Sequence, residues 1–356
     1  METLEHPHFT EDAAEALNRL RSAMPDGSRE RAKRLAKLHS KHVSTPRDDA
    51  LATEIEMLIQ NAAGSQDSVR RDGSALVVIG DSGAGKTTLL KRIIADRPEF
   101  APYEDRYGIS TSPLISVVAP SPCTLKQLGR EVLRALGYPL SREIKEHMVW
   151  ELVRQQIRIR KVMFIHIDEM QHAVNTLNDN EQQKLSDTIK NVMQQPDWPV
   201  SFILSGIPTL ARLVSSDVQL MRRSRIFEFS NLEFAKHAAS VRRMIEHMVT
   251  KHAEMQLASA LPDEFIHRLL HAAYGRFGVV IQIVRGAIEQ AMSDEAAGEQ
   301  VKARHFAAAY SRFSGCTEDE NVFLRTDWQM LQPSAALVRN RPTEGGTPAL
   351  KRPSKF

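Results

Sequence analysis

The chain has 356 residues, of which 42% are hydrophobic and 26% charged, an ordinary balance for a folded protein with one substantial core and a smaller domain. No apolar run approaches the roughly 20 residues that a membrane-spanning helix needs. The first residues lack the positive-then-apolar layout of a secretory signal. Cys123 and Cys316 give neither a disulfide framework nor zinc-site spacing. We therefore expect a cytoplasmic protein without a membrane partner.

The net charge of +3 is unevenly distributed along the chain. Residues 29–42 carry six Lys or Arg against one acid, and residues 339–356 carry five against one. The rest of the chain is therefore mildly acidic. Basic ends on an acidic body predict contact with an anionic partner, most commonly nucleic acid. A solvated helix face and an irregular tail explain the same charges equally well.

The first part of the chain is predicted to be helical. Leucines and alanines recur at helical spacing across residues 11–42, with an interruption at Pro25-Asp26-Gly27. Another helix is expected to begin after Thr45, because Asp48 and Asp49 then fall in its first turn. A polar loop over residues 64–73 follows this helix.

The middle of the chain alternates short apolar runs with helical patterns. The runs predict strands at 75–79, 114–118, 161–167, 200–204 and 226–229. The intervening patterns predict helices at 86–95, 124–136, 141–160 and 181–194. Strands joined by helices of this length predict an α/β fold with a doubly wound parallel sheet, whose ligand lies at the carboxyl ends of the strands.

Beyond residue 235 the strand pattern stops, and a small all-helical lid domain is expected. Its helices are predicted at 235–256, 263–274, 279–292 and 302–313. The sequence thus divides into an N-terminal helical basic extension, a P-loop core, a helical lid and a largely irregular C-terminal tail. We place these segments at 1–44, 45–232, 233–315 and 316–356.

A glycine-rich turn follows the first predicted strand. Its residues are Gly80, Asp81, Ser82, Gly83, Ala84, Gly85, Lys86 and Thr87, which match G-x-x-x-x-G-K-[ST] between a strand and a helix. Glycines let successive backbone N–H groups face phosphates, and the helix adds its positive end. Lys86 is expected to reach the β- and γ-phosphates, Thr87 to ligate Mg²⁺, and Thr88 to complete the cradle. The turn therefore predicts ATP and Mg²⁺ as ligands, and a chance glycine-rich turn is the weaker alternative.

Two acids end the third predicted strand. Asp168 is expected to hold the magnesium, and Glu169 to orient and deprotonate the attacking water. The alternative is that these acids merely end a strand and start a helix. His166 alternates with apolar strand residues, so we expect a packed or hydrogen-bonded core histidine and not a catalyst.

Two further positions are candidates for catalysis. Ser205, at the end of the fourth predicted strand, could hold the attacking water from the opposite side, although a serine before a glycine is also ordinary loop chemistry. Arg225, and after it Arg223, could stabilise transition-state charge on a neighbouring subunit's nucleotide as an arginine finger. A solvated basic turn or a DNA-facing cluster explains these arginines as well.

In this order of parts the sequence resembles an AAA+ ATPase, and within that superfamily it is similar to the TniB/TnsC family of bacterial transposon regulators. The resemblance covers about residues 45–313. Five segments carry the resemblance. They are residues 80–90 (the P-loop and the residues after it up to Leu90), 167–172 (Ile-Asp-Glu-Met-Gln-His), 204–208 (Leu-Ser-Gly-Ile-Pro), Gln219-Leu220, and Gly275-Arg276-Phe277-Gly278. Many AAA+ lids carry an arginine that reaches the γ-phosphate. Here that stretch reads Gly278-Val279-Val280-Ile281-Gln282, and Arg285 follows a turn later.

The resemblance implies a bacterial protein that assembles on double-stranded DNA as an ATP-bound ring or helical filament. It further implies contacts with a DDE transposase and a targeting protein of the TniQ type, and a reset by ATP hydrolysis. By this analogy Ser205 is the sensor-1 residue and Arg225 the finger. The protein would be associated with the nucleoid when it is on DNA.

Four residues are candidates for contacting the DNA backbone. Lys126 and Thr124 lie where the second predicted strand passes into a helix, and Arg106 and Lys91 are further possibilities. Each is individually more typical of an ordinary solvated side chain. Aromatic residues make up only 6% of the chain, which favours duplex backbone binding over stacking of single-stranded bases.

Two rival functions share the same core. One is another AAA+ class, such as a helicase loader or a secretion-system motor, although a motor would more often bring a membrane segment or a cell-wall module. The other is a scaffold that holds ATP without hydrolysing it.

Overall fold

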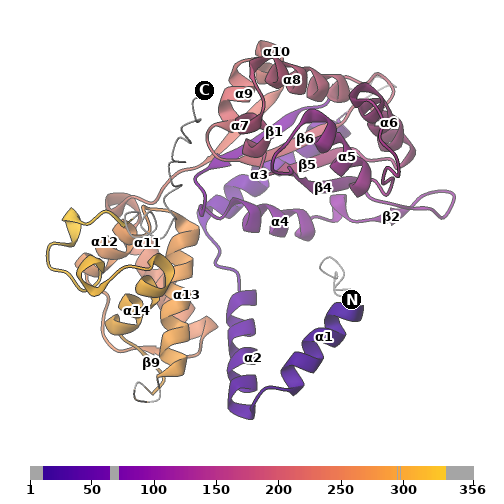
Figure 1. The fold of residues 1–356 in the computed structure, drawn as a ribbon. Coiled ribbons are helices and arrows are strands. Elements are labelled where there is room, and N and C mark those ends of the chain that lie inside the picture. Colours follow the sequence, from indigo (N-terminus) through magenta and orange to yellow (C-terminus); the bar gives the residue numbers. More distant parts are fainter. Residues whose placement is uncertain (1–10, 65–71, 295, 297, 334–356) are drawn as a thin grey trace, which may run out of the picture. The chain divides into compact units, whose positions relative to one another are not determined.

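A computed structural model describes residues 11–64, 72–294, 296 and 298–333 (Figure 1). The chain divides into two compact units. In the described part, the larger unit contains residues 11–17 and 44–230, and the smaller contains residues 18–43 and 231–333. Helix α1 (Glu11–Ser22) crosses the boundary at residue 17. The basic residues 339–356 lie outside the described residues.

The larger unit is built on a five-stranded sheet in the order β4-β5-β6-β1-β7, in which every neighbouring pair is parallel. The strands are β1 (Ala75–Gly80), β4 (Leu114–Val118), β5 (Phe164–Asp168), β6 (Ser201–Gly206) and β7 (Ser224–Phe229). All five strands predicted from the sequence are present. The doubly wound parallel sheet is therefore confirmed.

Alternating residues of the strands fill two separate cores, one on each face of the sheet. In β1, Val77 packs with residues of α5 to α9, whereas Val78 packs with residues of α3 and α4. Figure 1 shows these two sets of helices on opposite faces. The helices of this unit are α3 (Pro46–Ala63), α4 (Lys86–Asp96), α5 (Leu125–Ala135), α6 (Glu146–Ile159), α7 (Gln171–Thr176), α8 (Asp179–Met193), α9 (Leu210–Ser215) and α10 (Val218–Arg222).

Helix α3 begins where predicted, with Thr45 as its N-cap and Asp48 completing the capping box. Helix α6 begins at Glu146 instead of 141. Before it, Glu143 pairs with Lys126 and Arg130 of α5, which ties the preceding segment to that helix. The sequence also missed α7, α9 and α10 and the hairpin β2 (Tyr103–Glu104) with β3 (Ser110–Thr111), because segments of two to six residues are too short to show a period.

The smaller unit is mainly helical, as predicted for the lid. Its helices are α2 (Asp26–Ser40), α11 (Phe234–His247), α12 (Asp263–Ala272), α13 (Phe277–Ser293) and α14 (Ala303–Ser314), with a π-helical turn at Met248–His252. It is not all-helical, because β8 (Gln256–Leu257) pairs in parallel with β9 (Gln300–Val301). Two-residue strands leave no alternation for a sequence pattern to reveal.

The basic N-terminal helix packs within this smaller unit. Leu38 of α2 is completely buried in the lid core, as is Val322, and Trp328, also from beyond residue 315, is buried there. The structure therefore joins residues 18–43 and 316–333 to the lid, across the boundaries predicted at 44 and 315. Part of the helix's positive charge is paired there, since Lys37 contacts Glu254 at 2.7 Å. Similar pairs join Arg34 to Glu299 and His39 to Glu289.

Candidate nucleotide-binding site

The glycine-rich turn lies between the end of β1 and the start of α4, as predicted. Gly83 and Gly85 have φ angles of 82° and 95°, a left-handed conformation that side chains rarely adopt. Gly80 is needed for a different reason: a Cβ there would lie 2.6 Å from the Cβ of Phe229, on the neighbouring strand β7. Thus the motif glycines both shape the loop and let the two strands approach.

Lys86 is 8% exposed and lies under this loop. Its Nζ donates hydrogen bonds to the carbonyl oxygens of Gly80 at 2.7 Å and Asp81 at 3.0 Å. Burial lowers the pKa of Lys86, while the charges of Glu169, Asp168 and Asp81 act in the opposite direction. A buried ammonium facing a loop of backbone N–H groups makes a site for a polyanion.

Asp168 receives hydrogen bonds from both neighbouring elements. Thr87 Oγ1 of α4 donates to its Oδ2 at 2.7 Å, and Ser205 Oγ of β6 donates to its Oδ1 at 2.5 Å. Burial alone would raise the pKa of Asp168, but these hydrogen bonds, with one from the Glu169 backbone N–H, hold it below its ordinary value. The carboxylate is therefore ionised, and with the Thr87 hydroxyl it offers the hard oxygen ligands that Mg²⁺ prefers.

A buried histidine extends this hydrogen-bond chain. His166 is 2% exposed, and its Nε2 lies 3.3 Å from Ser205 Oγ while its Nδ1 lies 3.2 Å from Ser116 Oγ. Because the proton of Ser205 is committed to Asp168, Ser205 Oγ must accept from His166 Nε2–H. Burial lowers the pKa of His166, which favours the neutral ring that this arrangement requires. The prediction of a hydrogen-bonded core histidine is confirmed.

Ser205 is completely buried. Its hydroxyl is directed at Asp168, so in this geometry it orients that carboxylate and does not face solvent. The sequence placed Ser205 opposite an attacking water, which requires an accessible hydroxyl. The structure instead brings it to the carboxylate next to that site.

Glu169 is partly exposed and has a φ angle of 57°, so its backbone is in the left-handed region. Its carboxylate accepts a hydrogen bond from the Nε2 of Gln171. The sequence analysis gave Gln171 no role of its own, although its place two residues after the acid was a signal. A glutamine at that spacing can fold back on the preceding turn.

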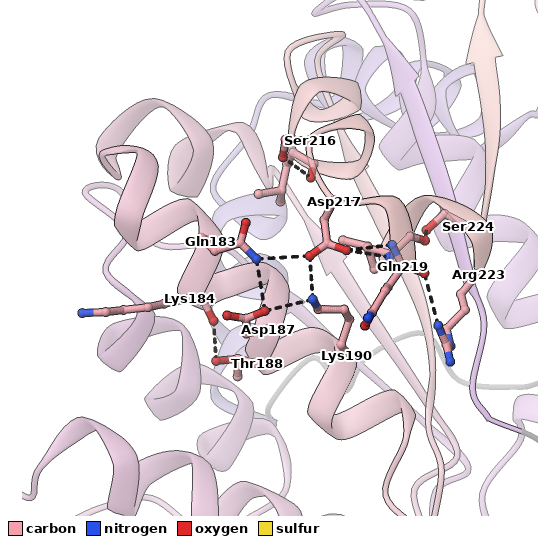
Figure 2. Close-up of polar contacts among 12 residues, drawn as sticks. Gln183, Lys184, Asp187, Thr188, Lys190, Ser216, Asp217, Gln219, Arg223 and Ser224 are labelled. Atoms are coloured by element: carbon pink, nitrogen blue, oxygen red, sulfur yellow. Dashed lines mark hydrogen bonds and ion pairs between the residues drawn. The ribbon is translucent and has the colours of Figure 1, made fainter.

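A polar cluster between α8 and α10 lies next to the arginine-bearing segment, and Arg223 contacts it through the carbonyl oxygen of Gln219 (Figure 2). Asp217 caps α10 by accepting from Gln219 N and Leu220 N, and it pairs with Lys190 at 2.5 Å. Arg223 follows α10 directly, so the cluster fixes the helix from which the arginine-bearing segment continues.

The two finger candidates are both engaged within the chain. Arg223 pairs with Asp72 at 2.8 Å, and Arg225 lies 3.6 Å from Glu54. Arg222, which the sequence analysis did not single out, is exposed and makes no ion pair within the described part of the chain. It differs from its neighbours in this respect.

The four candidate DNA contacts lie on three separate elements. Lys126 pairs with Glu143, and the Thr124 hydroxyl is used in the capping box of α5. Arg106 stacks over Tyr107, 4.8 Å from the ring centre, in the turn between β2 and β3. Lys91 is exposed on α4. Hence Lys126 and Thr124 already have partners in the chain.

Comparisons with known proteins agree with this fold. Residues 69–214 match the family described as AAA domain. No curated protein matches the sequence. Similar solved structures are Cdc6p of Pyrobaculum aerophilum (13% identity, TM-score 0.52, 80% of this chain and 72% of that chain) and the Orc1 protein of Aeropyrum pernix in complex with DNA (16%, 0.54, 80% and 70%). The ORC2 protein of Aeropyrum pernix in its ADP form is another (15%, 0.50, 79% and 72%).

Residues 69–214 therefore match an AAA domain that carries the P-loop, and the fold, a parallel sheet with helices followed by a helical region, is similar to that of the Cdc6p and Orc1 structures. These matches support an AAA domain and its fold, whereas similarity to the TniB/TnsC regulators stays a prediction. Within the described residues no helix is both long and apolar enough to cross a bilayer.

Proposed function

From this AAA domain we propose that the protein is an ATP-hydrolysing, DNA-binding regulator of transposition that assembles on duplex DNA. The observation that carries the proposal is the joining of P-loop, Asp168 and Glu169 at one edge of the sheet, with Thr87 and Asp168 in direct contact. The link to transposition rests on the sequence resemblance to the TniB/TnsC family. A DDE transposase and a targeting protein of the TniQ type are the proposed partners.

Each residue of the site has a proposed role in hydrolysis. The loop N–H groups and Lys86 bind the phosphates, and Thr87 and Asp168 would hold Mg²⁺, which supplies charge neutralisation when it is bound. Glu169 orients the attacking water and accepts its proton. Ser205 supports this chemistry through Asp168, because it keeps that carboxylate oriented and ionised.

An exposed face on α10 and β7 supports self-assembly. β7 is an edge strand of the sheet, and Val218, Met221 and Ile226 on this segment are 56%, 46% and 50% exposed. Exposed apolar side chains grouped with arginines are typical of protein contacts. We propose that this face meets the nucleotide side of another copy. ATP bound between the two copies would stabilise the contact.

The arginine finger is proposed to come from the same face. Arg225 and Arg223 remain candidates, but each would have to leave Glu54 or Asp72 to reach a neighbour's phosphate. We add Arg222 as a third candidate, because it is exposed without such a competing pair in the described residues. Single alanine variants of the three would rank them by loss of hydrolysis.

Duplex binding is supported by the shared fold of an Orc1 protein that was solved in complex with DNA. The residues proposed for backbone contact are Lys126, Thr124, Arg106 and Lys91. Lys91 and Arg106 are the stronger pair, since the other two are engaged in the chain. Their loss should weaken binding to all sequences equally and reduce its salt dependence.

The central test is DNA binding by gel shift with ATP, with a non-hydrolysable analogue, and without nucleotide. Lys86→Ala should abolish ATP-dependent binding, whereas Glu169→Gln should produce a long-lived bound form. Lys184→Ala removes an exposed lysine from α8 and is the matched control. Binding that ignores nucleotide would refute the switch.

Phosphate release and partner capture separate the rival functions. A wild-type protein that binds ATP but releases no phosphate, with or without duplex, would be a scaffold. Retention of a purified transposase on the DNA-bound protein would support transposition. Retention of a replicative helicase instead would favour a helicase loader.

A further inference from the structure

The turn that carries Glu169 is anchored to the neighbouring strand β6. Met170 N donates to the carbonyl oxygen of Ser205 at 2.9 Å, immediately after the left-handed residue Glu169. Asp168, before the turn, is bound by the Ser205 side chain. The backbone thus places the turn, but neither contact determines where the Glu169 carboxylate points.

Gln171 supplies the missing contact. Gln171 is 9% exposed, and the amino group and the carbonyl oxygen of its side-chain amide bond to different partners. Nε2 donates to Glu169 Oε2, while Oε1 accepts from the backbone N–H of Ile207 at 3.2 Å, just beyond β6. The glutamine amide donates to a carboxylate and accepts from an N–H at once, whereas an ionised Glu cannot donate and Met has no donor, so neither could replace both contacts.

The end of β6 is shaped to receive this amide. Gly206 lies between Ser205 and Ile207, and a Cβ there would be 2.7 Å from Gln171 Oε1 and 3.4 Å from Gln171 N. An alanine at 206 would therefore displace the amide from its place. The absence of a side chain at 206 is thus a second observation, beside the hydrogen bonds, that the chain leaves space for the Gln171 amide at this position.

We propose that Gln171 is a positioning residue for Glu169. Its amide joins the Glu169 carboxylate to the backbone just beyond β6 and so determines where that carboxylate points. This inference rests on the proposed function, because it assigns a role in hydrolysis. The three residues 205–207, at and just beyond the end of β6, then contact both acids: Ser205 binds Asp168, and Ile207 binds Glu169 through Gln171. Without the amide, Glu169 can take other rotamers and leave the attacking water unoriented.

The test is steady-state phosphate release with saturating duplex DNA. Gln171→Met keeps the volume and removes the amide, and it should lower kcat about 10- to 100-fold, the cost of a misplaced general base. The KM for ATP should stay within about 2-fold, since the P-loop is untouched. Gly206→Ala, which retains the glutamine but displaces it, should reproduce the loss.

A matched control is available on α8. Gln182 Nε2 donates to the carbonyl oxygens of Val174 and Leu177, at 2.9 and 3.0 Å, so it anchors a nearby loop without touching Glu169. Gln182→Met should leave kcat unchanged. An equal loss in both variants would mean that general loosening of the loops explains the effect, and would overturn the proposal.

A double-mutant cycle separates positioning from an independent role. In the Glu169→Gln background, Gln171→Met should cause no further loss of single-turnover rate, because its effect passes through the Glu169 carboxylate. Additive losses would overturn the proposal. If Gln171→Met keeps the kcat of the wild type, Gln171 has no positioning role, but the proposed ATPase function stands. If the wild-type protein itself releases no phosphate, both the positioning role and the ATPase function are refuted.

Discussion

Asp217 is the residue whose removal should most disturb the arginine-bearing segment. It is 7% exposed and accepts hydrogen bonds from Gln219 N at 2.9 Å and Leu220 N at 3.0 Å at the start of α10 (Figure 2). Lys190 and Gln183 of α8 contact its other oxygen at 2.5 and 3.2 Å. One carboxylate therefore both begins α10 and binds it to α8.

The expected loss of stability on replacing Asp217 can be worked out from the lowered pKa of its carboxyl group. Burial alone would raise the pKa of Asp217, but hydrogen bonds from Lys190, Leu220 N and Gln183 outweigh it and lower the pKa from 3.8 to about 2. A pKa lowered from 3.8 to about 2 corresponds to about 2.5 kcal/mol of preference for the ionised form. Asp217→Asn should cost about that much free energy of unfolding. Asp217→Ala also loses the N-cap and should cost about 1 kcal/mol more.

The pH dependence has a definite sign. Because the pKa of Asp217 is lower in the folded state, its contribution is fully present above its ordinary value of 3.8 and is lost as pH falls toward about 2. The stability difference between wild type and Asp217→Asn should therefore be constant from pH 7 to about 5. It should shrink steadily below about 4.

Urea denaturation of the larger unit, followed by tryptophan fluorescence, measures these differences. The control is Asp187→Asn, which removes the other acid bound to Lys190, at 2.9 Å, from a side chain that is 52% exposed. An exposed pair should contribute less than about 1 kcal/mol. Equal effects of the two variants, or a difference that does not change with pH, would refute the reasoning.

Three further outcomes are expected. Leu38→Ala should lower the free energy of unfolding of the smaller unit by about 2–4 kcal/mol, because Leu38 is fully buried in the lid core. In the same denaturation assay the control Leu20→Ala should cost under about 0.5 kcal/mol, because Leu20 is 56% exposed. Ser205→Ala should weaken magnesium-dependent nucleotide affinity several-fold in titration calorimetry and leave magnesium-free binding unchanged, since its hydroxyl orients Asp168. Gly80→Ala should lower the melting temperature, because the new Cβ would lie 2.6 Å from that of Phe229, and unchanged melting would contradict the close approach of β1 and β7.

The sequence was sufficient for the nucleotide site because its signals are local. A glycine-rich turn between a strand and a helix specifies its own backbone path, and an acidic pair at a strand end needs only the parallel sheet to reach it. Thus Lys86 lies under the glycine-rich loop, bonded to the Gly80 carbonyl, and Thr87 contacts Asp168. The apolar runs likewise located all five strands of the sheet.

Only the tertiary structure decided which residues far apart in the chain come into contact. The roles of Ser205, fully buried against Asp168, and of Gln171, bonded to Ile207, depend on which strands become neighbours. Leu38 reads as one more leucine on a basic helix, yet it fills the lid core. Periodicity reports which face of an element is apolar, but not which distant surface covers it, because that choice is made by packing across the whole fold.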